Sequence, residues 1–127
     1  MIQANEIKPN NIIDTPYGIA TVYGISKDCV QITLKDNESI FDFDLEDAKP
    51  IELTEDILLK CGFEVATEDG GVVGSYSYWS NGKIDLNNLG FWWFVVTTDF
   101  HHPRIDYLHQ LQNLYFALTQ TELEINL

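Results

Sequence analysis

Apolar residues recur every three or four positions between residues 107 and 118, and this is the clearest pattern in the chain. At about 100° per residue, the apolar side chains fall within an arc of about 120°. They are Tyr107, Leu108, Leu111, Leu114, Tyr115 and Leu118. The opposite side carries Asp106, His109, Gln110 and Asn113. The pattern predicts a long helix with one core-facing and one solvent-facing side, and Pro103 suits its first position because proline lacks an N–H.

The first 50 residues show short apolar segments separated by turn residues, which is the pattern of short β-strands. The segments cover residues 12–13, 19–25, 30–34 and 40–43. Gly24 indicates a bulge or a close approach of two backbones in the second segment. In the last segment Phe41 and Phe43 share one face, and Asp42 and Asp44 share the other. The segments predict a small, strongly bent sheet or an SH3-like β-barrel.

A short helix is predicted between Thr54 and Gly62. Thr54 suits the N-cap, because its hydroxyl can accept a hydrogen bond from a free backbone N–H. Glu55 and Asp56 in the first turn and Lys60 in the last complement the helix dipole. Gly62 suits the left-handed position that ends a helix.

Residues 63–98 predict an antiparallel meander. Its clearest strands are expected at residues 75–79, 83–86 and 91–96. Asn81 and Gly82 predict a type I′ hairpin turn, which needs positive φ at both central residues. The segment 91–96 is apolar on both faces. It is therefore expected to be a central strand, covered on both faces or covered on one and exposed at an interface.

The last residues, 122–127, alternate between polar and apolar positions and predict a final strand. The chain as a whole therefore predicts an α+β fold. An SH3-like β-barrel lobe is expected over residues 1–50. An antiparallel sheet with the short helix, covered by the long helix, is expected over residues 51–127, and the two parts are expected to form one compact unit.

The net charge of the chain indicates which classes of binding partner are favoured. Twenty acidic residues against seven basic ones give a formal net charge of −13. Direct nucleic-acid binding needs Lys and Arg contacts to phosphates, so the charge argues against it and against an anionic membrane surface. It favours a basic protein partner.

The N-terminal sequence and the cysteines favour a cytoplasmic location. The stretch MIQANEIKPNN lacks the apolar core of a signal peptide, and no apolar run approaches about 18 residues. Two cysteines, Cys29 and Cys61, do not form a disulfide framework and are expected to be reduced thiols.

Candidate catalytic chemistry is sparse. The three histidines, His101, His102 and His109, match no standard zinc spacing. Cys61 is expected at the C-terminal end of a helix, which disfavours a thiolate, and Cys29 is expected in a strand. The chain has no glycine-rich loop with the lysine of a phosphate site. We therefore predict no catalytic residue, no metal and no cofactor, and interpret the chain as a non-enzyme.

Two groups of residues are candidate partner-binding surfaces. The first is acidic, because residues 36–56 contain nine acids and one base, and its predicted members are Asp36, Glu38, Asp42, Asp44, Glu46 and Asp47. A solvated face is the simpler interpretation of such a run. The second is aromatic, and its predicted members are Tyr76, Tyr78, Trp92 and Phe94. Tyrosine and tryptophan are typical interface anchors, although most of the chain's aromatic residues are expected in the core.

Three motifs together resemble a family of small uncharacterised proteins of Bacteroidota and their phages and mobile elements. They are LEDAKPIELTEDILL continued by KCGFE, then YLHQLQNLYFAL, then ELEINL. The resemblance covers roughly the last two-thirds of the chain, with a looser match before it. It implies no known activity, but it suggests a mobile-element gene and an anti-defence role. Where the family usually has Gly after the long helix, this chain has Gln120, so its helix is expected to end less sharply.

Three functional hypotheses follow. The first is a non-enzymatic acidic module that binds a protein partner in the cytoplasm, with a homodimer as an alternative. The second is an anti-defence inhibitor, similar in kind to anti-CRISPR proteins, whose acidic surface acts as a nucleic-acid decoy for a nucleic-acid-handling protein. The third is a small-ligand-binding protein or hydrolase with a pocket between the two lobes, lined by Tyr76, Tyr78 or His109.

Overall fold

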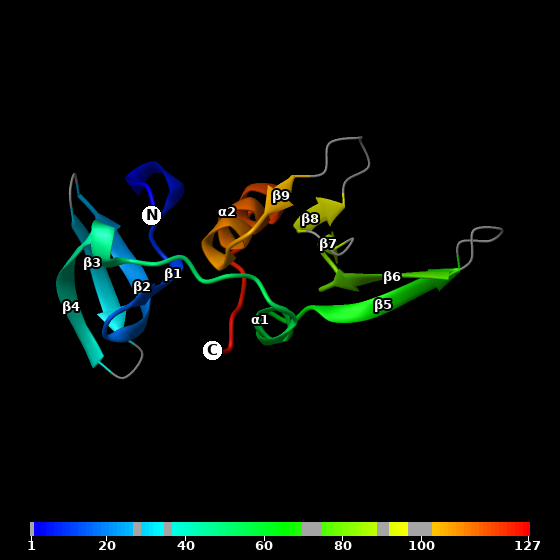
Figure 1. Ribbon diagram of the computed structural model, residues 1–127, viewed down its shortest axis with the longest axis horizontal. Helices are drawn as coiled ribbons and strands as arrows, with labels where there is room; N and C mark the ends of the chain where they lie inside the picture. The colour runs from blue at the N-terminus through cyan, green and yellow to red at the C-terminus, as the bar shows by residue number, and fades with distance from the viewer. Residues whose placement is uncertain (1, 27–28, 35–36, 70–74, 89–91, 97–102) are drawn as a thin grey trace.

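Two antiparallel sheets and one main helix make up the chain, which confirms the predicted α+β class. The computed structural model describes residues 2–26, 29–34, 37–69, 75–88, 92–96 and 103–127 (Figure 1). The first sheet contains β1 (Ile12–Thr15), β2 (Gly18–Ile25), β3 (Cys29–Leu34) and β4 (Asn37–Asp44). The second contains β5 (Glu64–Asp69), β6 (Ser75–Ser80), β7 (Asp85–Asn88), β8 (Trp93–Val96) and β9 (Arg104–Ile105). The helices are η1 (Ala4–Glu6), η2 (Leu45–Asp47), α1 (Glu55–Lys60) and α2 (Leu108–Thr119).

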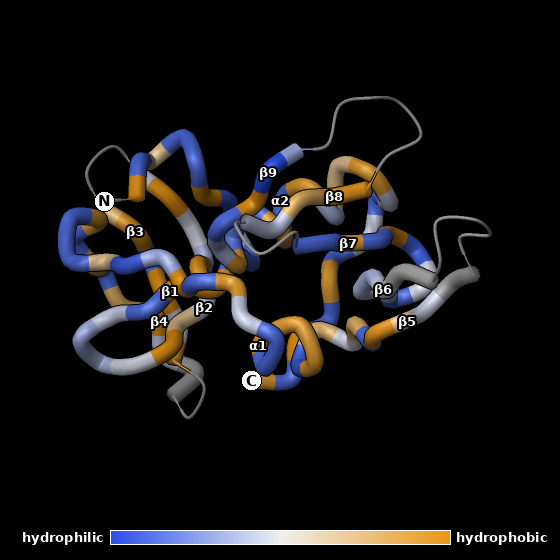
Figure 2. Tube along the Cα trace, turned by 45° about the vertical axis from the view of Figure 1, so that its right-hand side comes forward, coloured by the Kyte–Doolittle hydropathy of each residue, from blue (hydrophilic) through white to orange (hydrophobic). Residues whose placement is uncertain are grey.

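We call β1–β4 with η1 and η2 the first lobe, and β5–β9 with α1 and α2 the second lobe. The two sheets lie toward opposite ends of the long axis, and α2 lies between them (Figure 1). Figure 2 shows α2 in the same central position from a second direction, with both hydrophilic and hydrophobic residues along its trace. The helix therefore has a sheet on either side.

The first sheet is open, so the prediction of a barrel is wrong in this respect. Its strands pair in the order β1-β2-β3-β4, which leaves β1 and β4 as edges among the described residues. The inner face is covered by residues outside the strands, including Ile2, Ile7 and Ala48, which are buried in one apolar cluster with it. This cover replaces the pairing of first and last strands that would close a barrel. The predicted irregularity at Gly24 is confirmed, because the β2–β3 register shifts between Val22 and Gly24.

The second sheet is a meander in the order β5-β6-β7-β8-β9. The predicted type I′ turn is wrong, because Asn81 does not have positive φ and four residues, 81–84, separate β6 from β7. The Asn81 side chain closes this loop by accepting hydrogen bonds from the backbone N–H groups of Lys83 and Ile84, at 3.0 and 3.1 Å. An asparagine can therefore shape a turn through its side chain as well as through its backbone angles.

The caps of α1 agree with the prediction. The Thr54 hydroxyl accepts from the N–H of Ile57 at 3.2 Å, and Gly62 follows the helix with a φ of 84°. The predicted final strand is wrong: residues 122–127 form no strand, although Leu123 is buried in the core of the second lobe. The N–H of Asn126 donates to the carbonyl of Lys60 at 2.8 Å, so this segment is anchored to the end of α1 rather than to a sheet.

Helix α2 begins at Leu108 rather than at Pro103, because Arg104 and Ile105 pair with β8 as a short strand. The Gln110 side chain then accepts from the N–H groups of Asp106 and Tyr107, at 2.8 and 3.1 Å. These two bonds satisfy donors at the helix start. At the other end, Gln120 adopts a left-handed conformation with φ 60° and ψ 24°, a position that glycine normally occupies.

The apolar side of α2 packs as predicted at Leu108, Leu111 and Tyr115, which belong to the core of the second lobe. The prediction fails at Leu118, which is 53% exposed. It also fails at His109, which was assigned to the solvent side but is completely buried. A second lobe on the polar side of α2 explains the burial, since periodicity alone cannot distinguish water from a polar protein surface.

The polar side of α2 forms a hydrogen-bonded seam with the first lobe. The Gln112 side chain accepts from the N–H of Ile12 at 2.8 Å and donates to the carbonyl of Asn10 at 2.9 Å. Asn113 accepts from the Asn11 side chain at 2.8 Å and donates to the carbonyl of Glu6 at 2.9 Å. These bonds link positions about a hundred residues apart in sequence, and they fix the first lobe against the helix.

Candidate functional site

The predicted acidic residues that the structure describes follow one edge of the first sheet. Asp42 and Asp44 lie on the edge strand β4, and Glu46 and Asp47 lie in η2 directly after it; all four are exposed. Asp44 also caps η2 by accepting from the N–H of Glu46 at 3.2 Å. None of the four forms a salt bridge with a described basic residue. We call these four residues the acidic edge.

Two other predicted acids are not placed. Asp36 lies outside the described residues. Glu38 belongs to β4, but its side chain is not described. The acidic edge is therefore defined without them.

An apolar hollow lies beside the acidic edge and was not predicted. It has a volume of about 290 Å³ and is lined by Tyr17, Ile32, Leu34, Phe41, Asp42 and Phe43. We call it the β4 hollow. It forms because Ile32 and Phe41 are paired across β3 and β4 on the inner face of the sheet, and the apolar cover does not extend over Phe41, which is 39% exposed. The only signal of the hollow in the sequence is that Phe41 and Phe43 share one face of the predicted strand.

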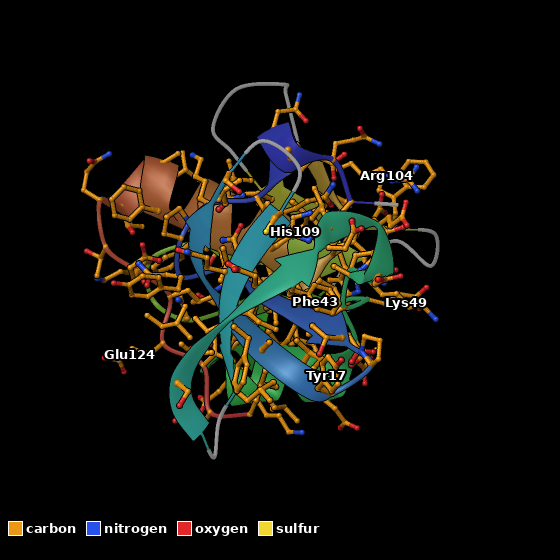
Figure 3. All side chains as sticks on the ribbon, turned by 90° about the vertical axis from the view of Figure 1, so that its left-hand side faces the viewer. Tyr17, Phe43, Lys49, Arg104, His109 and Glu124 are labelled. Carbon is orange, nitrogen blue, oxygen red and sulfur yellow. The ribbon has the colours of Figure 1, made fainter. Side chains whose placement is uncertain are left out.

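Tyr17 forms the outer wall of the β4 hollow. It lies in the turn between β1 and β2, is 74% exposed, and contacts Phe43 edge to face with ring centroids 6.4 Å apart and an interplanar angle of 75° (Figure 3). The turn is held by the Thr15 hydroxyl, which donates to the carbonyl of Gly18 at 2.7 Å and accepts from the N–H of Tyr17 at 3.1 Å. Gly18 has a φ of 113°, which a side chain rarely permits. The aromatic ring is thus positioned by a tight local turn.

The described residues of the predicted aromatic surface differ in exposure, and one of them contacts an arginine. Trp92 is 45% exposed, whereas Phe94 and Tyr78 are half-buried; the side chain of Tyr76 is not described. The guanidinium of Arg104 lies 4.8 Å from the centre of the Trp92 ring. Strand β8 is buried on one face at Trp93 and exposed on the other at Val96, which is the predicted alternative of one covered face.

A polar hollow of about 410 Å³ lies next to Trp92. It is lined by Glu52, Leu53, Asn88, Trp92, Trp93, Arg104, Asp106 and Tyr107. Arg104 is the basic residue in this lining, and it already has two contacts. Its Nε donates to Asp106 Oδ1 at 2.9 Å, and its guanidinium stacks on Trp92. An anionic ligand would have to compete with Asp106 for this guanidinium.

Thiol and metal chemistry find little support in the described residues. No group of three or more His, Cys, Asp or Glu within the described ranges could hold a metal ion, and His101 and His102 lie outside them. Cys29 and Cys61 are both free thiols. Burial raises the pKa of Cys61 to about 12, so its reactive thiolate form is scarce at neutral pH.

His109 lies in the seam between the lobes and does not line a surface pocket, because its side chain is 0% exposed. Its ring stacks on Tyr107, with centroids 5.9 Å apart and an interplanar angle of 7°. Its Nε2 lies 3.6 Å from Glu6 Oε2, which is too long for a good hydrogen bond. Burial lowers the pKa of His109 below its ordinary value, and the Glu6 carboxylate opposes this shift only in part.

Acidification is therefore expected to destabilise the protein through His109. The unfolded chain takes up a proton near the ordinary histidine pKa of about 6.5, whereas the folded protein resists it until lower pH. The free energy of unfolding should be highest above about pH 6.5 and should fall as the pH drops toward the lowered pKa. Urea titrations across this range would measure the fall.

The variant His109→Phe is the control, because it keeps a flat ring against Tyr107 and removes the titration. Its stability should fall less than that of the wild type over the same pH range. The two proteins differ only at position 109, so the difference between their stability curves isolates His109. Parallel curves for the two proteins would contradict the assignment.

The fold and these surfaces define a two-lobed α+β protein with an acidic sheet edge beside an apolar hollow. Comparison of the chain with protein-family models, curated proteins and solved structures finds no match. The resemblance to Bacteroidota and phage proteins therefore stays a prediction. No helix within the described ranges is long and apolar enough to cross a membrane.

Proposed function

We propose that this protein is a non-enzymatic interaction module that binds a basic protein partner through the first lobe. The observation that carries the proposal is the acidic edge next to the exposed aromatic wall of the β4 hollow, formed by Tyr17 and Phe41. Acidic side chains steer a basic partner toward the surface, and an adjacent aromatic hollow offers an anchor point. Two free thiols support a reducing compartment, and we include the cytoplasm in the proposal on that basis.

The arrangement of the acids favours one kind of partner. Asp42 and Asp44 are two residues apart on one strand and so lie on the same face, about 7 Å apart along it. Glu46 and Asp47 continue the negative charge beyond the end of the strand. Phosphate-like negative charges are what the basic residues of a nucleic-acid-binding groove contact. The second candidate is therefore an anti-defence decoy whose partner handles nucleic acid.

The test is partner capture from a lysate of the cells that naturally express the chain, with tagged wild type and two charge variants. The edge variant neutralises Asp42→Asn, Asp44→Asn, Glu46→Gln and Asp47→Asn. The control variant neutralises Glu52→Gln, Glu64→Gln, Glu122→Gln and Glu124→Gln, which are also exposed. Both change the net charge of −13 by the same amount, and asparagine at position 44 can still cap η2.

The edge variant is expected to lose about tenfold of the captured partner at low salt, while the control variant retains it. Equal losses from both variants would contradict the proposal, because they would reflect bulk charge alone. Retention at high salt by both variants would also contradict it and would favour the aromatic surface at Trp92 and Phe94. Release of the partner by added duplex DNA would favour the decoy.

A further inference from the structure

The floor of the β4 hollow is apolar and formed by the sheet itself. Ile32 and Phe43 are almost fully buried, and Leu34 is partly buried against the same cluster. These side chains cannot hydrogen-bond, so they favour an occupant with a hydrocarbon stem. The volume of about 290 Å³ lies at the lower limit of small-molecule pockets, which span about 300–1,000 Å³. One long side chain suits this space better than a cofactor.

The walls of the hollow favour a cation at its mouth. Tyr17 is 74% exposed and Phe41 is 39% exposed, so both rings are accessible to a ligand. Phe43 is buried and packs edge to face with Tyr17, so the accessible aromatic surface at the mouth is that of Tyr17 and Phe41, and a cation within about 6 Å of the Tyr17 ring centre lies in the range of a cation–π interaction. A cation over aromatic faces gains more where water is partly excluded.

The acidic residues of β4 give the surroundings of the hollow a negative charge, which attracts a cation. Asp42 is one of the residues that line the hollow, but its side chain and that of Asp44 project from the face of β4 opposite Phe41 and Phe43, so their carboxylates act on the hollow from across the edge strand. Neither forms a salt bridge with a described basic residue. These carboxylates would repel an anionic occupant, and a neutral occupant would gain no electrostatic attraction from them. The apolar hollow and the neighbouring acidic edge are thus together complementary to a positive charge on an apolar stem.

We infer that the β4 hollow binds one lysine or arginine side chain of the partner. The hydrocarbon stem packs on Ile32, Leu34 and Phe43, and the charged group lies over Tyr17 at the mouth, where the acidic edge of the same strand attracts it. This inference rests on the proposed function, because it names the group through which a basic partner is anchored. The segments flanking that lysine or arginine then run along the acidic edge.

The experiment uses the full chain and three short peptides that differ only at their central residue. The central residue is lysine, arginine or norleucine, flanked by glycine and serine with both peptide ends blocked. Titrations followed by ¹H–¹⁵N NMR detect weak binding and locate it. The lysine and arginine peptides are expected to shift the amide signals of Leu34, Phe41 and Phe43. The norleucine peptide, which has the stem without the charge, is expected to bind at least fivefold more weakly.

Two tyrosine variants test the position of the site. Tyr17→Leu keeps apolar bulk but removes the ring, and is expected to weaken lysine-peptide binding by about 2- to 30-fold. Tyr23→Leu is the matched control, because Tyr23 is 59% exposed on β2 and does not line the hollow. Equal binding of the norleucine peptide, or equal loss in both variants, would overturn the inference. The NMR spectrum of each variant shows directly whether it is folded.

The outcomes separate this inference from the proposed function. If the edge variant loses the captured partner but Tyr17→Leu changes neither capture nor peptide binding, the proposed function stands and the inference is wrong. If Tyr17→Leu weakens peptide binding while the edge variant still captures every partner, the hollow is a cation site and the proposed function is wrong. Joint loss in capture and in peptide binding supports both.

Discussion

Replacing Leu111 with alanine is expected to lower the free energy of unfolding by about 2–4 kcal/mol. Leu111 is 0% exposed and lies in the core of the second lobe with Leu108 and Tyr115 of the same helix and Val95 of β8. Alanine would remove buried methyl groups and leave a cavity that this core cannot fill without moving α2. Because α2 also carries the contacts to the first lobe, the whole protein should lose stability together.

Urea denaturation of the wild type and the variant would measure this loss. The matched control is Leu118→Ala, the same chemical change on the same helix at a side chain that is 53% exposed. That control should change the free energy of unfolding by about 0.5 kcal/mol or less. A loss below about 1 kcal/mol for Leu111→Ala would mean that the core-facing side of α2 is assigned wrongly.

Replacing Gln112 with alanine is expected to destabilise the protein by about 1–3 kcal/mol. Gln112 is 3% exposed, and its side chain serves two backbone groups of the first lobe, the N–H of Ile12 and the carbonyl of Asn10. Alanine would leave both partly buried groups without a protein partner, and such groups are costly when unpaired. The effect should concentrate at the junction of the two lobes.

Urea denaturation and amide hydrogen exchange would test this prediction together. Gln3→Ala is the control, because Gln3 is exposed and makes no capping hydrogen bond at the start of η1. The Ile12 amide should exchange faster in Gln112→Ala than in the control. Unchanged exchange at Ile12, or equal stability of the two variants, would show that the lobes are held together without Gln112.

The open first sheet and the proposed binding surface have one structural origin. A closed barrel would pair β4 with another strand and cover its inner end. In this protein β4 remains an edge, Phe41 stays accessible, and acidic residues follow the strand into η2. Charged residues on an edge strand also discourage edge-to-edge aggregation, and the acidic edge fits that role.

Local signals in the sequence predicted the elements that depend on a few adjacent residues. The four strands of the first sheet follow the alternation of apolar and polar residues, and α1 follows its Thr54 cap and the glycine at position 62. The core side of α2 follows from Leu108 and Leu111, because these positions recur at helical spacing. Such features are determined by side-chain direction and backbone preference within one or two turns.

The sequence by itself determined the α+β class, most of the elements and the strong negative charge. Only the tertiary structure decided that the polar side of α2 meets the first lobe, where His109 and Gln112 are buried. It also decided that Tyr17 and Phe41, separated in sequence, form one hollow beside the acidic edge. The physical reason is that burial depends on which distant surfaces meet, and a periodic pattern gives the direction of a side chain but not what lies opposite it.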